Sequence, residues 1–246
     1  MNMDALVQQI RNRYQQVKEQ VAQSALHVGR TPESVRILVV TKTQPVEIIQ
    51  AAIQAGITLF GENYPEEALP KILAFRDHPF LEWHMIGHLQ SRKARIVVQH
   101  FDVMETIDRV EIAEKLNRLA QEAQRCLPVL LELNVSGEES KFGFPAWNQE
   151  TLSLLENEVE KILSLPFLSI RGLMTMPPLF EHMEESRPYF VKLRQVQDLL
   201  KKKFPQACWD ELSMGTSVDY PVAVQEGATI IRIGTAILGP RRQKTV

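Results

Sequence analysis

Residues 36–45, with the sequence RILVVTKTQP, contain a short apolar run from Ile37 to Val40. Such a run is typical of a strand buried on both faces, and strands of this kind belong to parallel sheets covered by helices. Lys42 follows the run directly, and Pro45 ends the segment. A partly desolvated lysine amine has a lowered pKa, which favours attack on a carbonyl group. The alternative, which this strand alone favours, is a lysine that ends a strand by reaching into water.

Seven further strands are expected, and helical patterns separate them. The eight expected strands cover residues 37–40, 57–60, 82–86, 102–105, 128–133, 170–174, 211–213 and 229–233. Short buried strands that alternate with helices predict an α/β fold with a (β/α)8 TIM-type barrel, and a doubly wound open sheet is the alternative. An extra N-terminal helix is expected within residues 1–30, because Leu6, Ile10 and Val17 recur at helical spacing. We expect a single domain over residues 1–246, with a flexible tail at 240–246.

The composition excludes several classes of protein. The 246 residues are 44% hydrophobic and carry a formal net charge of −2, so no basic field points to nucleic acid or to an anionic membrane. Cys126 and Cys208 cannot form a disulfide framework and have no metal-ligand spacing, which indicates reduced thiols in a cytoplasmic protein. The sequence shows no signal peptide and no apolar run long enough to cross a bilayer. We therefore expect a cytoplasmic protein that holds no metal.

Two runs of small residues follow the last two expected strands. They are residues 213–217, SMGTS, and residues 234–236, GTA. Glycine lets backbone N–H groups approach an oxyanion, and serine and threonine hydroxyls are further donors. Either run alone is an ordinary turn. Functional groups of such barrels lie at the carboxyl ends of the strands, often with a phosphate site after strands seven and eight, so the two runs together favour phosphate binding.

Arg232 lies inside the apolar strand IIRI, at residues 230–233. A buried arginine is nearly always paired, because burying an unpaired charge is costly. Its partner is either a carboxylate on a neighbouring strand, such as Glu62 or Glu211, or a ligand that offers a ring nitrogen or a phosphate. The longest irregular segment is residues 137–147, which we expect to be a flexible loop near the mouth of the pocket. The role of Lys141 in this loop stays open.

A lysine that can bind an aldehyde, a phosphate site and a buried arginine together describe a pocket for pyridoxal 5′-phosphate (PLP). The chain also contains, in order, VVTKTQP, GENYPEEA, WHMIGHLQSRK, IRGLMTMPP and LSMGTSVDYPVAVQEGATIIRIGTAILG. These segments resemble the pyridoxal phosphate homeostasis proteins of the YggS/PROSC type, which are related to the N-terminal barrel of alanine racemase. The resemblance runs from about residue 36 to residue 239 and implies a PLP-binding barrel of fold type III.

The resemblance implies a set of cofactor-binding residues. Lys42 would hold PLP as a Schiff base, and Arg232 would face the pyridine nitrogen. A cation at that nitrogen disfavours its protonation and makes the ring a weaker electron sink. Asn63 would lie against the ring. The full expected set is Lys42, Asn63, His84, Met174, Ser213, Gly215, Thr216, Arg232, Gly234 and Thr235.

The resemblance implies a monomer that takes part in intracellular PLP homeostasis, has no catalytic residues and passes PLP to apo PLP enzymes by transient contact. A PLP-dependent amino-acid racemase is the alternative. Racemisation needs acid and base groups on both faces of the Cα atom, and alanine racemases supply one of them from a second, dimer-forming domain. We expect a chain of this length to be without that domain, and Tyr64 and His88 are the nearest candidates for the second group. A third interpretation is a lyase or isomerase in which Lys42 binds the carbonyl group of a sugar phosphate.

Overall fold

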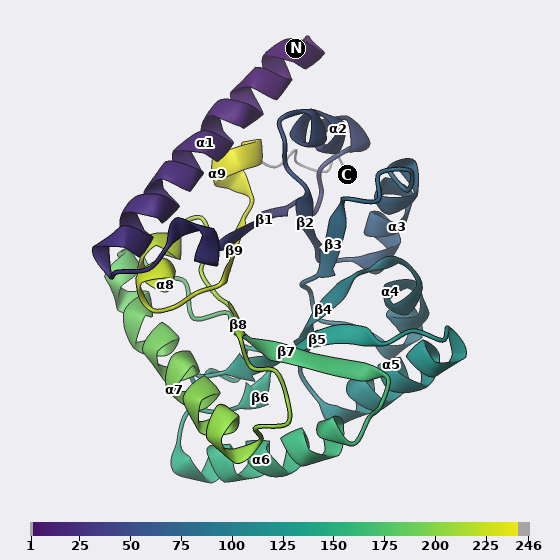
Figure 1. Cartoon of the computed structure of the whole chain (residues 1–246), viewed down its shortest axis with the longest axis vertical. Helices are drawn as coiled ribbons and strands as arrows, with labels where there is room; N and C mark the ends of the chain where they lie inside the picture. The colour runs from purple at the N-terminus through teal and green to yellow at the C-terminus, as the bar shows by residue number, and fades with distance from the viewer. Residues whose placement is uncertain (1, 241–246) are drawn as a thin grey trace.

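The computed structural model describes residues 2–240, and eight of its parallel strands form a closed barrel (Figure 1). These strands are β1 (Arg36–Val40), β2 (Leu59–Glu62), β3 (Glu82–Met85), β4 (Val103–Ile107), β5 (Leu127–Asn134), β7 (Leu168–Met174), β8 (Glu211–Ser213) and β9 (Ile230–Ile233). They are hydrogen-bonded in the order β4-β3-β2-β1-β9-β8-β7-β5, and a further pairing between β4 and β5 closes the ring. The predicted TIM-type barrel is confirmed, and the open-sheet alternative is wrong. The two-residue strand β6 (Phe144–Pro145) pairs with β5 outside the barrel order.

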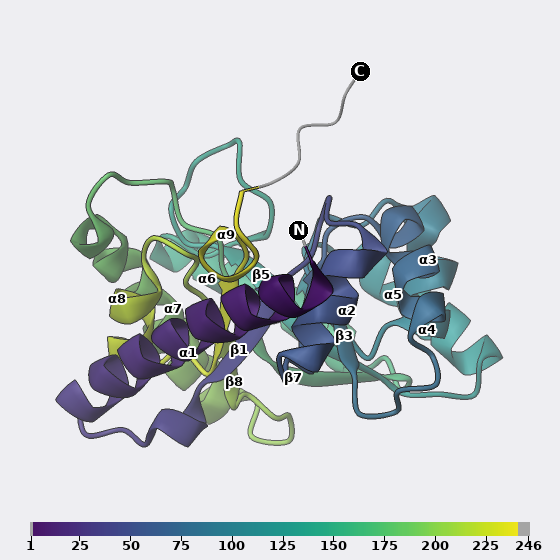
Figure 2. The same cartoon turned by 90° about the horizontal axis from the view of Figure 1, so that it is seen from above.

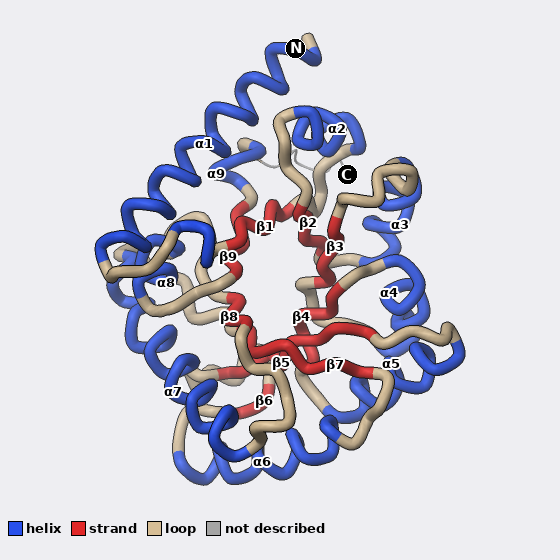
Figure 3. Tube along the Cα trace, viewed as in Figure 1, coloured by secondary structure: helices blue, strands red, loops and turns tan. Residues whose placement is uncertain are grey.

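Helices form a ring outside the strands (Figure 3). They are α1 (Met3–His27), α2 (Val46–Gln54), α3 (Pro65–Ala74), α4 (Ala94–His100), α5 (Val110–Glu122), α6 (Gln149–Leu163), α7 (Arg187–Lys203), α8 (Tyr220–Gln225) and α9 (Thr235–Leu238). The predicted N-terminal helix is present as α1, which contacts α2, α8 and α9 and lies across the outside of the barrel (Figure 2). No helix of residues 2–240 is long and apolar enough to cross a membrane.

Side chains alternate along each strand between the core that lies between barrel and helices and the inside of the barrel. In β1, Ile37 and Val39 join the large apolar core that also contains the buried faces of the helices, whereas Leu38 belongs to a separate small cluster. The same alternation in β9 sends Ile231 and Ile233 outward. Since neighbouring strand residues face opposite sides, the remaining positions point into the barrel. These inward positions include several polar residues that are described with the site.

Several element boundaries differ from the predicted ones. β2 begins and ends two residues later than expected, and β4 runs to Ile107, so Thr106 lies within the strand rather than after it. The expected elements did not include α6, although Leu152, Leu155 and Val159 recur at helical spacing and all are buried. Asn148 caps this helix by accepting a hydrogen bond from the Thr151 N–H group (2.9 Å). The expected flexible tail lies, from residue 241 onward, outside the described residues.

Candidate functional site

A cavity of about 750 Å³ opens at the carboxyl ends of the barrel strands. Segments that follow β1, β2, β3, β5, β7, β8 and β9 all contribute to its wall. Of the ten residues expected in the site, seven line this cavity. They are Lys42, Asn63, Met174, Thr216, Arg232, Gly234 and Thr235. Parallel strands bring their carboxyl ends to one end of a barrel, which is why residues so distant in sequence meet here.

Lys42 lies two residues beyond the end of β1, in a segment that a buried ion pair anchors. The Lys71 ammonium group on α3 contacts Glu62 Oε1 (2.8 Å) and donates a hydrogen bond to the carbonyl oxygen of Thr41 (2.9 Å). The Thr41 hydroxyl in turn donates to Glu62 Oε1 (2.7 Å). Burial raises the pKa of Glu62, against the opposing effect of Lys71. Lys71 and Glu62 thus fix Thr41, the residue immediately before Lys42.

The residue after Lys42 has an unusual backbone conformation. Thr43 has a φ angle of 63°, in the left-handed region, which a β-branched residue rarely adopts. Its N–H group donates to the carboxylate of Glu67 on α3. Strain of this kind costs on the order of 1–3 kcal/mol and persists where surrounding contacts determine it. The α3 side chains therefore hold Lys42 in place from both sides.

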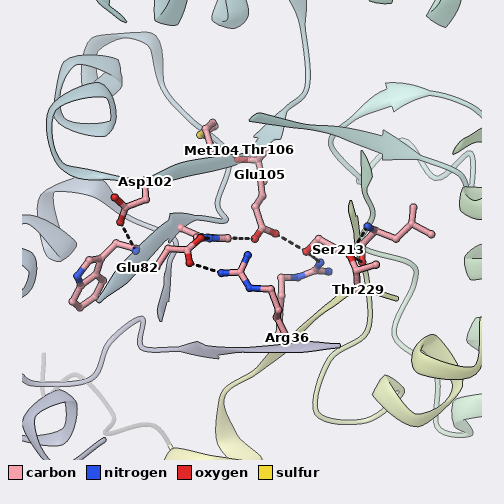
Figure 4. Close-up of polar contacts among 12 residues, drawn as sticks. Arg36, Glu82, Asp102, Met104, Glu105, Thr106, Ser213 and Thr229 are labelled. Atoms are coloured by element: carbon pink, nitrogen blue, oxygen red, sulfur yellow. Dashed lines mark hydrogen bonds and ion pairs between the residues drawn. The ribbon is translucent and has the colours of Figure 1, made fainter. Parts of the chain in front are cut away.

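Arg232 enters the cavity wall from β9, with its guanidinium group held from beneath. Its Nη1 atom donates to Ser213 Oγ (2.7 Å), and Nη2 donates to the carbonyl oxygen of Thr175 (2.8 Å). The Ser213 hydroxyl donates to the carboxylate of Glu105, as Figure 4 shows. Burial lowers the pKa of Arg232, while the charge of Glu105 opposes that effect. The guanidinium group is therefore fixed by the Ser213 hydroxyl and the Thr175 carbonyl oxygen, with the Glu105 carboxylate behind Ser213.

The expected carboxylate partners of Arg232, Glu62 and Glu211, were wrong. A Cβ atom added at Gly61 would meet Leu38 Cδ2 at 2.2 Å, so position 61 faces the barrel interior. Alternation then turns Glu62 outward to Lys71. Glu211 lies two residues before Ser213 on the same face of β8, and burial raises its pKa, against the opposing charge of Arg36.

A chain of polar contacts continues from Glu105 through the barrel interior to its opposite end. His84 Nδ1 contacts Glu105 Oε1 (2.5 Å), and His84 Nε2 contacts Glu82 Oε1 (2.7 Å). Glu82 also pairs with Arg36 (Figure 4). Burial alone would lower the pKa of His84, but hydrogen bonds and charges of Glu105 and Glu82 raise it to about 9. Both ring nitrogens of His84 are therefore donors at neutral pH.

Three of the expected site residues do not line the cavity. His84 has an exposed fraction of 0%, and its ring is fully engaged by the two carboxylates. Ser213, which is also fully buried, lies beneath Arg232 and supports it. Gly215 has a φ angle of +92°, and an added Cβ atom would meet Ala223 Cβ at 2.5 Å. The structure thus gives Ser213 and Gly215 supporting positions, with the Gly215 carbonyl accepting the Arg232 N–H (3.0 Å).

The segments expected to bind phosphate lie side by side on one wall of the cavity. Thr216 and Ser217 follow β8, and Gly234 and Thr235 follow β9. The Thr216 N–H and hydroxyl groups both donate to Asp219 Oδ1, at 2.7 and 3.0 Å. A hydroxyl has a single hydrogen to donate. Thr216 therefore has to release Asp219 before its hydroxyl can donate to an anion.

The loop that follows β5 forms part of the mouth of the cavity. Ser140, Lys141 and Phe142 line the cavity. Lys141 Nζ donates to the carbonyl oxygen of Pro177 (3.3 Å), and the Phe142 ring stacks on His88 with centroids 4.1 Å apart. These two contacts join the loops after β3, β5 and β7. His88 also contacts Asp108 Oδ2 (2.5 Å), so its ring is oriented from two sides.

The sequence reasoning missed Glu132. This residue lies near the end of β5, is 6% exposed and lines the cavity. The signal was present in the sequence, because Glu132 interrupts an otherwise apolar strand in the same way as Arg232 does. Glu105 interrupts β4 in the same manner. Charged residues inside buried strands therefore indicate two residues of the cavity wall, Glu132 and Arg232, and one residue that supports Arg232 from below, Glu105.

The chain resembles known proteins over almost its whole length. A family model for the N-terminal domain of alanine racemase matches residues 7–242. The pyridoxal phosphate homeostasis protein of Vibrio alginolyticus is 42% identical over 235 residues, which cover 94% of this chain and 97% of that protein. The protein of the same name from Escherichia coli K12 is 40% identical over 92% of this chain and 94% of its own length.

Solved structures give the same result. PipY of Synechococcus elongatus PCC7942, in its structure with PLP bound, is 37% identical with a TM-score of 0.77, covering 91% of this chain and 100% of PipY. Alanine racemase of Clostridium difficile 630 is 14% identical with a TM-score of 0.69 and shares the fold, covering 97% of this chain and 58% of the racemase chain. The chain belongs to the pyridoxal phosphate homeostasis protein family.

Proposed function

We propose that this protein binds PLP and takes part in its homeostasis, holding the cofactor as a Schiff base on Lys42. The observation that carries this proposal is the meeting of Lys42, Arg232 and two glycine- and hydroxyl-containing segments in one cavity. PLP supplies a reactive aldehyde and an electron-withdrawing ring when it is bound. The PLP-bound structure of PipY supports the assignment.

The residues of the cavity fit this cofactor. Lys42 offers an amine for the aldehyde, and Arg232 offers a cation that a ring nitrogen or an oxyanion can approach. Asn63 Oδ1 is buried without a hydrogen-bond partner among the described residues, although Asn63 lines the cavity. A buried polar atom of this kind is costly unless a ligand or water satisfies it. We propose that Asn63 lies against bound PLP, with Met174 on the cavity wall at the end of β7 and with Gly234, Thr235 and Thr216 near the phosphate.

The protein in this proposal has no dedicated reaction. It keeps the reactive aldehyde bound and passes it to apo PLP enzymes by transient contact, as a cytoplasmic monomer. Tyr64 and His88 both line the cavity, but His88 is engaged by Asp108 and Phe142, and Tyr64 is 53% exposed. Incubation of the PLP-loaded protein with L-alanine in D2O tests this point. Fast, stereospecific deuterium incorporation at Cα would make the protein a racemase-like enzyme.

The first experiment is the visible absorption spectrum of the purified, PLP-loaded protein before and after borohydride reduction. We expect a yellow band that borohydride removes, with the reduced cofactor attached to the peptide containing Lys42. Lys42→Ala should lose this covalent attachment completely, because the variant has no amine at that place. Lys93→Ala is the matched control, since Lys93 is another lysine of the cavity wall and pairs with Glu66 (2.7 Å).

The outcomes separate the proposal from its alternatives. A Lys93→Ala variant that behaves like the wild type, beside a Lys42→Ala variant without the band, supports the assignment. A wild-type protein that stays colourless with added PLP contradicts it. In that case, a borohydride-trapped adduct with a sugar phosphate would support the lyase or isomerase alternative.

Phe142→Ala tests whether the loop after β5 controls release of the cofactor. The stacked pair of Phe142 and His88 joins two loops at the mouth, and an aromatic pair contributes about 0.5–1.5 kcal/mol. We expect PLP transfer to an apo-enzyme to become about two- to tenfold faster. Stopped-flow absorbance of the transfer measures this rate, and Phe80→Ala, an exposed aromatic that does not line the cavity, is the control. An unchanged transfer rate would remove this loop from the release step.

A further inference from the structure

Glu132 is a carboxyl group of the cavity wall with an unused hydrogen-bonding atom. Its neighbours in β5, Leu131 and Leu133, both pack into the outer core, so alternation turns Glu132 into the barrel. The residue is 6% exposed and lines the cavity. Its Oε2 atom is buried and has no hydrogen-bond partner among the described residues.

The surroundings of Glu132 favour its neutral form. Burial is the main cause that raises the pKa of Glu132, the negative charge of Asp108 adds to it, and the positive charge of Arg232 opposes it, with a net pKa of about 7. Other charged groups of the cavity wall are Lys42, Lys93 and Lys141. At neutral pH the group therefore exists in both protonation states, and small changes in its environment decide between them.

The two protonation states offer different chemistry to a ligand. A neutral carboxyl group has one O–H donor, whereas a carboxylate only accepts hydrogen bonds. PLP is rich in acceptors, namely its ring nitrogen, its ring oxygen and its anionic phosphate. An ionised Glu132 would add a negative charge to a buried site that receives an anion, and such like-charge contacts are unfavourable. The neutral form therefore suits this class of ligand better than the ionised form does.

We propose that Glu132 binds an acceptor atom of the phosphorylated pyridine ligand as a neutral carboxylic acid, so that ligand binding takes up a proton and weakens as the pH rises. This inference rests on the proposed function and adds regulation to the same site. The proton comes from solvent and moves to the Glu132 carboxylate; this proton transfer is separate from Schiff-base formation on Lys42, in which the amine and the aldehyde form a C=N bond and release water. Loss of this proton favours release of the ligand.

The test compares PLP binding by the wild type and by Glu132→Gln between pH 6 and pH 8.5. Glutamine has nearly the same shape and keeps a donor at every pH. PLP itself titrates in this range, but its own titration is common to both proteins, so the ratio of the two dissociation constants isolates Glu132. We expect a ratio near one at pH 6. At pH 8.5 the wild type should bind on the order of tenfold more weakly than the variant, because a group with a pKa of about 7 is then almost fully ionised.

Two further measurements follow the proton directly, and the second uses the wild type alone, so it does not depend on how well the variant folds. Titration calorimetry in buffers of different ionisation enthalpy should show more proton uptake at pH 7.5 in the wild type than in Glu132→Gln. Isotope-edited infrared spectra should show a protonated glutamic acid band that grows when PLP binds to the wild type. Equal proton uptake and no such band would contradict the inference.

The outcomes also separate this inference from the proposed function. If the wild type does not bind PLP at any pH, the proposed function fails. If both proteins bind PLP and the ratio of their dissociation constants is the same from pH 6 to pH 8.5, the role of Glu132 fails and the proposed function stands. A ratio that rises with pH supports both.

Discussion

Replacing Glu105 by glutamine is expected to lower the free energy of unfolding at pH 7 by about 3–5 kcal/mol. The Glu105 carboxylate is fully buried between two cationic groups, His84 at 2.5 Å and Arg232 beyond the Ser213 hydroxyl. Glutamine keeps the shape of the side chain but removes its charge. Both cations then stay buried with weaker compensation, which is the costly outcome for a broken buried pair. Urea denaturation followed by circular dichroism measures the loss.

The contact between His84 and Glu105 also predicts how the stability of the protein depends on pH. The pKa of His84 is raised from its ordinary value of 6.5 to about 9 in the folded protein. The stability that this pairing contributes is therefore fully present below about pH 6.5 and is lost as the pH rises through about 9. Glu105→Gln should show a smaller loss of stability over this interval, because Glu82 alone then faces His84. Equal pH dependence of the two proteins would contradict the pairing.

A surface ion pair provides the control for Glu105→Gln. Arg95 and Glu122 lie 2.9 Å apart, with side chains 60% and 47% exposed. Exposed pairs contribute about 0–1 kcal/mol, so Glu122→Gln should change the free energy of unfolding little. A loss below about 1 kcal/mol for Glu105→Gln, similar to the control, would show that the buried chain of contacts adds no stability.

Lys71→Met is expected to lower the free energy of unfolding by a similar amount, about 3–5 kcal/mol at pH 7. The Lys71 side chain is 5% exposed and faces the fully buried Glu62 carboxylate at 2.8 Å. Removing the ammonium group leaves Glu62 buried without its cation and removes a donor from the Thr41 carbonyl oxygen. The backbone before Lys42 loses an anchor, so PLP affinity should fall along with stability. Urea denaturation and PLP titration measure the two effects.

The double variant Lys71→Met with Glu62→Gln tests the cause. Because a neutral pair has no uncompensated charge, the double variant should recover part of the stability that the single variant loses. Lys161→Met is the exposed control, since Lys161 pairs with Glu158 on the surface. The loss in Lys71→Met should also be smaller at low pH, where Glu62 becomes protonated. A double variant less stable than Lys71→Met would exclude the uncompensated charge as the cause.

The barrel and the location of the site were predictable from sequence because both depend on local patterns. Continuous apolar runs identify buried strands, and the residues just after such runs lie at the carboxyl ends. Lys42, Gly234 and Thr235 were found in this way, and all line the cavity. The missing α6 had a clear helical pattern with a capping Asn148, so that omission reflects an unused local signal.

The partners of the charged residues were not predictable in the same way. The expected partner of Arg232 was either a carboxylate such as Glu62 or Glu211 or a ligand atom. Within the protein, its guanidinium group is held by Ser213 and Thr175, with Glu105 behind Ser213. The strands β4 and β9 are far apart in sequence and are not neighbours in the barrel. Their side chains meet only because the closed barrel directs inward residues of all strands to a common interior.

The sequence by itself determined the alternation of strands and helices, the carboxyl ends of the strands where the cavity lies, and Lys42 as the lysine of the proposed Schiff base. Apolar periodicity and turn residues act over a few positions, so they can be recognised without a fold. The tertiary structure decided which inward charges contact one another, that His84 lies beneath the cavity, and that Glu132 faces the ligand site with an unused oxygen. These features depend on strand register and barrel closure, because a shift of one residue would turn each side chain to the opposite face.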